Sequence, residues 1–402
     1  MRTQGTEQLG AAATKWLLSP SADPANPYNN DVLNGLTAYN DIRLNNASAA
    51  LFGQIAWKVT DRLTVQPGIR VNYDEKDGLY ERRVFTNFGA GPELTFATRG
   101  AAAAAQRDQL TPQRFEPSFS AWNFSWDFNV NYKVTPDVLV YATYAKTFKT
   151  GGINLNGVPN DSAGNPILAV GSVKPESINH WEVGLKSQFW NRRVVFNLAA
   201  FRTTIDDFQA LVNAGAVSTT RGFLANAEKV RTQGIEAEFS VRPSERFNLY
   251  FNAAYTDAKY VKFTGAPCPP ELSGGSIVSC DISGQRLPGV SDWALSYGAE
   301  YNVPSSLFGR EGQFYLGVDG NYRSDFSSNP SPSAGTVIDG YALTNFRAGF
   351  RTEKGFDIYG WVRNAFDTQY LELLQIAPGS TGLIVGTPGD PRTYGLTLKA
   401  QF

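Results

Sequence analysis

Hydrophobic and polar residues alternate along most of this chain. In the segment 122–132, every even position is aromatic or aliphatic and every odd position is polar. A period of two is the spacing of a β-strand that has one apolar and one polar face. The pattern predicts about 13 strands, which are longer than the five or six residues usual in globular sheets. Its further copies occupy the segments 49–59, 63–73, 181–189, 235–241, 247–256, 293–301, 314–323 and 345–351.

The connections between these strands alternate between short and long. Tight connections are expected near 60–62, 135–137, 191–192, 243–245 and 352–354, and long ones over 74–117, 149–174, 260–292, 324–339 and 369–390. Short periplasmic turns and long extracellular loops are typical of outer-membrane barrels, whereas a soluble β-sandwich has no reason for this regularity. The predicted fold class is therefore all-β, an antiparallel transmembrane β-barrel with a lipid-facing apolar side and a polar lumen.

Composition is compatible with this prediction. No run of 18 apolar residues occurs, so no transmembrane helix is expected, but a membrane strand needs only alternate apolar residues. Aromatic residues make up 13% of the chain, which suits aromatic girdles at the two membrane interfaces. The net charge of −1 favours no nucleic-acid partner. The N-terminus has no apolar region of a signal peptide, so either that peptide was removed or the front of the protein is missing.

Little in the sequence indicates catalysis. His180 is the one histidine, the glycine-rich stretches lack phosphate-loop spacing, and no cysteine–histidine cluster occurs. We therefore predict neither an enzyme nor a cofactor or metal site. Cys268 and Cys280 lie in a segment rich in proline, glycine and serine. They suggest a local disulfide in an oxidising compartment, and two free thiols are the alternative.

Five segments resemble signatures of the TonB-dependent outer-membrane receptors. They are 140–154, 174–186, 234–238, 364–370 and 389–402, in the order found in that family. The resemblance implies a 22-strand barrel in which residues 48–402 form the C-terminal portion, strands 10–22, with 1–47 an extracellular loop or irregular segment. The family's plug domain and TonB box are not found, and the partner of the first strand is expected before the start of this chain.

The same resemblance extends to the last strand. Tyr394, Leu396, Leu398 and Phe402 share one face of it. A terminal aromatic residue on such a strand resembles the signal that is read by the barrel assembly machinery. These four residues are therefore candidates for an assembly signal.

The function that the resemblance implies is reception and TonB-energised uptake of a scarce solute, in particular a ferric siderophore, at the cell outer membrane. The implied partners are outer-membrane lipid, the barrel assembly machinery, the small-molecule ligand, and the TonB complex through an absent N-terminal region. Two alternatives stay open at this point. One is a passive outer-membrane channel, and the other is a structural or adhesin-type surface barrel.

Two groups of residues are candidates for functional contacts. Lys146, Lys149 and Asn154 flank or begin a predicted long loop, where they could meet an anionic ligand, although ordinary interface lysines would look the same. The second group is predicted to face the lumen, where it could contact a plug or a diffusing substrate, or simply keep the lumen solvated. Its members are Arg70, Asp127, Glu182, Lys186, Glu236, Glu238, Arg323 and Arg347.

Overall fold

The chain folds into one large antiparallel β-sheet. The computed structural model describes residues 1–17, 32–161, 163–213, 222–266, 268–272, 279–329, 333–352, 355–376 and 383–400. Fourteen long strands and three short ones make up the sheet. The long strands are β1 (Arg2–Gln8), β2 (Thr37–Gln54), β4 (Leu63–Phe85), β7 (Ser118–Thr135), β8 (Val138–Lys149), β11 (Glu176–Phe189), β12 (Val194–Asn213), β13 (Gly222–Ser244), β14 (Phe247–Lys262), β15 (Trp293–Leu307), β16 (Arg310–Arg323), β19 (Tyr341–Thr352), β20 (Phe356–Arg363) and β23 (Thr393–Ala400).

Smaller elements lie in the connections. The helices are α1 (Ala13–Leu17) and α2 (Ala101–Gln109), with 3₁₀ turns at Asn87–Gly89, Leu168–Val170, Pro270–Leu272 and Ala334–Thr336. In the described part of the chain, no helix has the length and apolar character needed to span a membrane. The short strands are β3 (Trp57–Lys58), β5 (Glu93–Leu94), β6 (Gln113–Phe115), β9 (Gly152–Ile153), β10 (Ser172–Val173), β17 (Phe326–Ser327), β18 (Val337–Ile338), β21 (Leu371–Ile376) and β22 (Ile384–Pro388).

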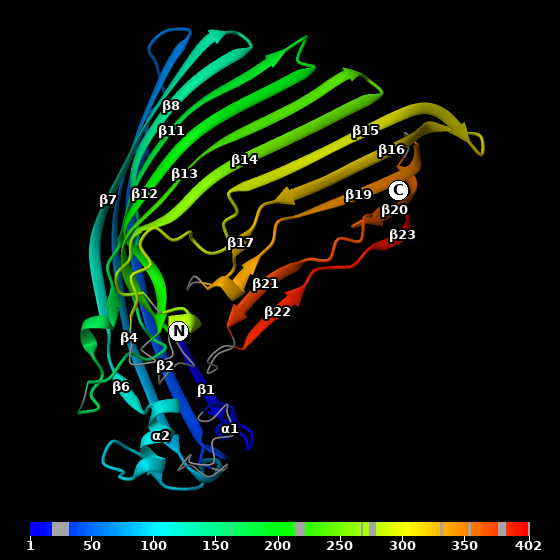
Figure 1. The fold of residues 1–402 in the computed structure, drawn as a ribbon. Coiled ribbons are helices and arrows are strands. Elements are labelled where there is room, and N and C mark those ends of the chain that lie inside the picture. Colours follow the sequence, from blue (N-terminus) through cyan, green and yellow to red (C-terminus); the bar gives the residue numbers. More distant parts are fainter. Residues whose placement is uncertain are drawn as a thin grey trace.

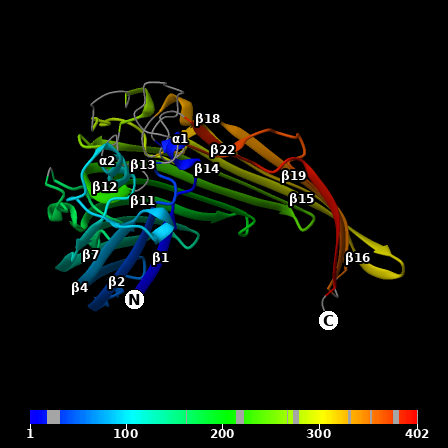
Figure 2. The ribbon, with the colours of Figure 1, turned by 90° about the horizontal axis from the view of Figure 1, so that it is seen from below.

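Each long strand pairs antiparallel with the next long strand along the chain, from β1 to β23. The sheet curves into a trough, with β1 and β23 as its two edges (Figure 2). Among the described residues, each of these two strands pairs on one side only. The predicted fold class was an antiparallel transmembrane β-barrel, and its all-β, antiparallel character is confirmed.

The two rims of the trough differ. Tight turns follow one rim, at the top of Figure 1, and the long connections with both α-helices gather at the other. The turn between β15 and β16 is a two-residue hairpin, since Leu307 pairs with Arg310. Its central residues, Phe308 and Gly309, have φ of 50° and 72°. Positive φ at both positions defines the type I′ turn, whose twist matches that of the strands it joins.

The two faces of the sheet differ in polarity and in crowding. On the apolar face, Trp122 is 74% exposed and Leu396 is also 74% exposed. On the polar face, Asn72 and Asp74 are only 7% and 6% exposed. Side chains crowd together on the inside of a curved sheet and spread apart on the outside. The polar face is therefore the concave one and the apolar face the convex, outward one.

Outward aromatic residues form a belt toward the rim that carries the long loops. Tyr73 and Trp122 pack with ring centroids 5.0 Å apart, as do Tyr255 and Trp293. Between these pairs, the ring centroid of Tyr144 lies 4.1 Å from that of Trp181. Trp and Tyr collect at the boundary between hydrocarbon and headgroups, so the belt marks the membrane boundary on the loop side.

The expectation for residues 1–47 was wrong in part. Strand β1 lies within that range, and β2 begins at Thr37 instead of near residue 48. Strand β1 pairs with residues 37–43 of β2, so a partner for the first predicted strand lies within this chain. Similarly, β4 continues to Phe85, through a stretch expected to be loop. Alternation could not reveal these extensions, because they rise beyond the aromatic belt, where the outward face is polar as well: Tyr39, Asp41 and Arg43 share it.

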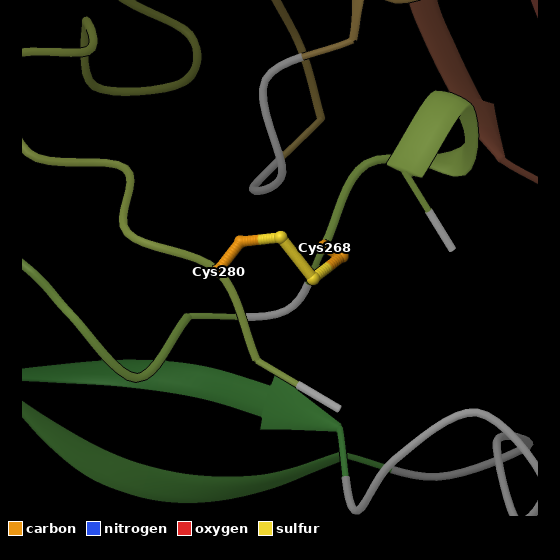
Figure 3. The surroundings of a disulfide bond; sticks show 2 residues. All are labelled: Cys268 and Cys280. Atoms are coloured by element: carbon orange, nitrogen blue, oxygen red, sulfur yellow. A yellow bond between two sulfur atoms is a disulfide. The ribbon is translucent and has the colours of Figure 1, made fainter. Parts of the chain in front are cut away.

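The long connections have small hydrophobic cores of their own. One packs Leu33, Leu36 and Val84 with part of helix α2. Another joins Val230, Tyr260 and Phe263 to Ala266 and Ile282. The predicted disulfide is present beside this second core and joins Cys268 to Cys280 (Figure 3). These connections are folded structures, held by apolar packing and a covalent bond.

Candidate functional site: the concave face

All eight residues predicted to face the lumen lie on the concave face. Residues directly opposite each other on neighbouring strands share a face of the sheet. Arg70 stands opposite Ser125, and Glu236 stands opposite Ala199, on the side away from the outward apolar residues. The others follow by the same alternation. They are Asp127, Glu182, Lys186, Glu238, Arg323 and Arg347.

The concave side of β15, β16, β19 and β20 carries a network of ion pairs, which we call the paired wall. Arg347 reaches Glu300 at 3.1 Å and Asp319 at 2.6 Å. Arg351 reaches the other oxygen of Glu300 at 2.5 Å and donates to Asn302 at 2.6 Å. The Glu300 side chain is 11% exposed, so one largely buried carboxylate serves two guanidinium groups.

The network continues through a tyrosine. The guanidinium carbon of Arg351 lies 4.6 Å from the centre of the Tyr315 ring. The hydroxyl of that tyrosine donates to Asp357 at 3.0 Å. A cation over an aromatic ring is attracted by the ring's quadrupole. Each charged group of this network thus has a partner on the same sheet.

The concave side of β7, β11 and β13 is different, and we call it the carboxylate wall: Asp127, Glu182, Glu236 and Glu238. Glu182 accepts from the Tyr141 hydroxyl at 2.7 Å, and Glu238 accepts from the Asn197 amide at 3.0 Å. In the described ranges, neither Asp127 nor Glu236 has an ion pair or a side-chain hydrogen bond. This wall has more carboxylates than its own sheet neutralises.

The neighbours of the two unpaired carboxylates are small. Asp127 stands between Gly68 and Ala145, and Glu236 stands between Ala199 and Ala254. A Cβ at position 68 would lie 2.4 Å from a carboxylate oxygen of Asp127, so glycine makes room for this side chain. Both carboxylates therefore face open space on the concave side.

The three predicted loop-mouth residues lie in three different places: on the outward face, on the concave face and buried in the loop. Lys146 pairs with Trp126 and Asn179, which places it on the outward face. Its expected role required a position at the concave mouth, so that expectation was wrong. Lys149 does face inward, and its ammonium lies 3.0 Å from Glu176. The Lys146 prediction overlooked parity: an odd number of positions separates these two lysines, so they point to opposite faces.

Asn154 is a structural residue of the mouth. It is 4% exposed, and its amide nitrogen donates to the carbonyl oxygens of Val170 and Leu224 at 2.7 and 2.9 Å. Its oxygen accepts the Leu224 amide hydrogen at 2.8 Å. The side chain thus fastens the loop after β8 to strand β13, which leaves no free polar atom for a ligand.

Further clamps that the sequence analysis missed hold the same loop. The amide nitrogen of the Gln209 side chain donates to the carbonyl oxygens of Thr150 and Lys174 at 2.9 and 3.1 Å. Its backbone amide donates to Glu176 at 2.9 Å. Within the loop, hydrogen bonds from Asn165 hold the pKa of the Asp161 carboxyl below its usual range. No local sequence signal marks contacts that join positions so far apart in the chain.

The geometry defines a class of protein, the outer-membrane β-barrels. This chain forms a wall of such a barrel, with a polar interior and ordered loops at one mouth. The family is shown by a family model described as "TonB dependent receptor-like, beta-barrel", which matches residues 3–365. This chain belongs to that family, whose members are outer-membrane transport receptors, and its location is the outer membrane.

Named relatives are similar to parts of this chain. The catecholate siderophore receptor Fiu of Escherichia coli (strain K12) is 23% identical over 280 residues, which cover 69% of this chain and 32% of the relative. The ferric-pyoverdine M114 receptor PbuA of Pseudomonas sp. (strain M114) is 26% identical over 240 residues, covering 58% of this chain and 25% of the relative. This chain therefore spans about a third or less of the length of these relatives.

A solved structure is similar in fold. The ferric yersiniabactin uptake receptor FyuA from Yersinia pestis matches with a TM-score of 0.66 and 17% identity. The match covers 91% of this chain and 47% of that receptor. At this identity the likeness supports the fold alone.

Proposed function

We propose that this chain forms part of the wall and mouth of a receptor that takes up a ferric siderophore, or a comparable scarce solute, with energy from the TonB complex. The observation that carries the proposal is the carboxylate wall below an ordered loop mouth. Asp127 and Glu236 are unpaired in the described structure and open to the concave space. Such groups suit contact with a separate body that brings cations or hydrogen-bond donors into the barrel, either a plug or the donor groups of a passing ligand.

The names of the relatives support the choice of solute. Fiu is a catecholate siderophore receptor, PbuA a ferric-pyoverdine receptor, and CntO of Pseudomonas aeruginosa a metal-pseudopaline receptor. All three names describe receptors for small metal chelates. For this chain we propose the same class of ligand and no particular member of it.

Two further partners belong to the proposal. Outer-membrane lipid would cover the outward apolar face, and the barrel assembly machinery would read the last strand. Tyr394, Leu396 and Leu398 do lie on the outward face, at 82%, 74% and 63% exposure. Phe402, the fourth residue of the predicted signal, lies outside the described residues.

Uptake of radiolabelled iron tests the proposed function. The gene, as its organism carries it, is placed in a host that lacks its own siderophore receptors, and a panel of ferric siderophores is supplied at low iron. We expect uptake of at least one chelate, and loss of that uptake when the host's TonB is deleted. Equal uptake with and without TonB would instead indicate a passive channel, and conductance in planar bilayers would then measure the pore.

A further inference from the structure

Cations gather on the outward face of β8–β14, next to the aromatic belt on its loop side. Lys146 follows the belt residue Tyr144 on β8, and Arg202 stands opposite the belt residue Trp181. Alternation along β13 and β14 places three more cations on the same face. We call these five residues the outer cationic patch: Lys146, Arg202, Lys229, Arg231 and Lys259.

Strand register aligns much of the patch. A single row runs across five neighbouring strands through Lys146, Asn179, Thr204, Arg231 and Lys259. Neighbouring strands lie about 4.8 Å apart, so this row is roughly 19 Å long. Apart from the threonine hydroxyl, the row presents N–H donors, which are suited to an anion larger than a single carboxylate.

The patch has more positive than negative charge. Two carboxylates share this face, Asp206 and Asp257. Lys229 lies 3.2 Å from the first, while Arg231 and Lys259 lie 2.9 and 2.8 Å from the second. Five cations and two anions leave a net charge of about +3.

Two cations of the patch lack a partner. In the part of the chain that the structure describes, neither Lys146 nor Arg202 forms an ion pair, and both are exposed. The Nε atom of Arg231 is buried and likewise has no hydrogen-bond acceptor. Exposed, unpaired cations beside a membrane boundary attract anionic headgroups from the surrounding lipid.

The neighbouring sector of the same face has the opposite character. Beyond the belt pair Tyr73 and Trp122, strand β4 presents Glu75 and Asp77, opposite Ser120 and Ser118 of β7. Both acidic side chains are exposed. The charge of the outward face thus changes sign between β4–β7 and β8–β14, which excludes a uniform layer of basic residues as the explanation of the patch.

From this arrangement we infer that the outer cationic patch binds the phosphate groups of the phosphorylated glycolipid in the outer leaflet. The belt fixes the depth at which headgroups begin, and the long basic side chains can extend along it while their apolar stems stay in contact with lipid. Basic clusters at that depth attract anionic headgroups. The inference concerns the outward face and stands whether or not the proposed ligand is correct.

Native mass spectrometry of the full chain in mild detergent tests the inference, with purified lipid A as the probe. The variant K146Q/R202Q removes the two unpaired cations, and its matched control E75Q/D77N removes two charges from the acidic sector. We expect K146Q/R202Q to bind lipid A about tenfold more weakly, the control to bind at least as well as the parent, and K146R/R202K to retain binding. If the double variant does not fold, the single variants K146Q and R202Q give the same comparison.

Two further arms identify the source of the phosphate. Enzymatically dephosphorylated lipid A should bind as weakly to the parent protein as intact lipid A binds to K146Q/R202Q. Inorganic phosphate at millimolar concentration should not displace lipid A. Equal binding of intact and dephosphorylated lipid A, or equal losses in both double variants, would overturn the inference. Displacement by inorganic phosphate would also overturn it, since the patch would then be a site for free anions.

Discussion

The two walls of the concave face handle charge in opposite ways. On the paired wall, Glu300 lies between two arginines, and each charged group of the network has a partner on the same sheet. On the carboxylate wall, Asp127 and Glu236 stand beside glycine or alanine and keep no partner among the described residues. The charged groups of the paired wall have partners within the sheet, whereas Asp127 and Glu236 leave their carboxylates open to the concave space. Polar lumen residues are therefore not interchangeable, although all of them look alike in the sequence.

The largest expected difference between the walls concerns stability. Replacing Glu300 by alanine leaves two guanidinium groups without their shared carboxylate, and we expect a loss of about 2 kcal/mol or more in the free energy of unfolding. The matched variant Glu236→Ala removes an unpaired carboxylate and should change that free energy by less than about 0.5 kcal/mol. Urea unfolding in lipid vesicles, followed by tryptophan fluorescence, measures both. Similar losses in the two variants would show that the walls do not differ energetically.

A smaller effect is expected from double-mutant cycles, which isolate one interaction on each wall. For Glu300→Ala with Arg351→Ala, we expect a coupling of about 1–2 kcal/mol, because the contact is charged and Glu300 is largely buried. For Tyr141→Phe with Glu182→Gln, the coupling should be about 1 kcal/mol or less. In this pair only the acceptor is charged, and glutamine can still accept the hydrogen bond. The same unfolding measurement gives both values. A larger coupling on the carboxylate wall would reverse the comparison.

The smallest expected effect comes from changes that keep the charge. Arg351→Lys preserves the positive charge but loses the planar guanidinium that lies over the Tyr315 ring, so a cost of about 1 kcal/mol is expected. Lys186→Arg on the other wall should be neutral within about 0.5 kcal/mol, because no ion pair in the described structure depends on that ammonium. Midpoints of urea unfolding suffice for this test. A neutral Arg351→Lys would mean that charge alone, without the planar guanidinium, holds the paired wall.

Alternation was sufficient to predict which face each lumen residue occupies. Arg70, Glu236 and Arg347 lie on the concave face, because side chains in a strand alternate strictly between the two faces. The fold class followed from the same pattern together with the lengths of the connections. These features depend on short stretches of sequence and on no knowledge of register.

Contacts between distant strands could not be predicted. The pairing of Arg351 with Glu300 joins residues 51 positions apart and depends on two strand registers. The role of Asn154 depends on a loop that folds back onto Leu224, 70 positions away. Lys146 is a different case: its parity with Tyr144, which the sequence shows, places it outward, whereas nearness to a loop does not determine the face.

The rim of tight turns has a consequence for the chemistry of the concave face. A shift of one residue in strand pairing would move every side chain of that strand to the other side of the sheet. Such a slip in β16 would point Asp319 at lipid and turn its apolar neighbours toward water. The Phe308–Gly309 turn fixes the register of this strand against β15. The polar lining of the concave face is thus set in part at the rim opposite the long loops, by a turn that lies outside that lining.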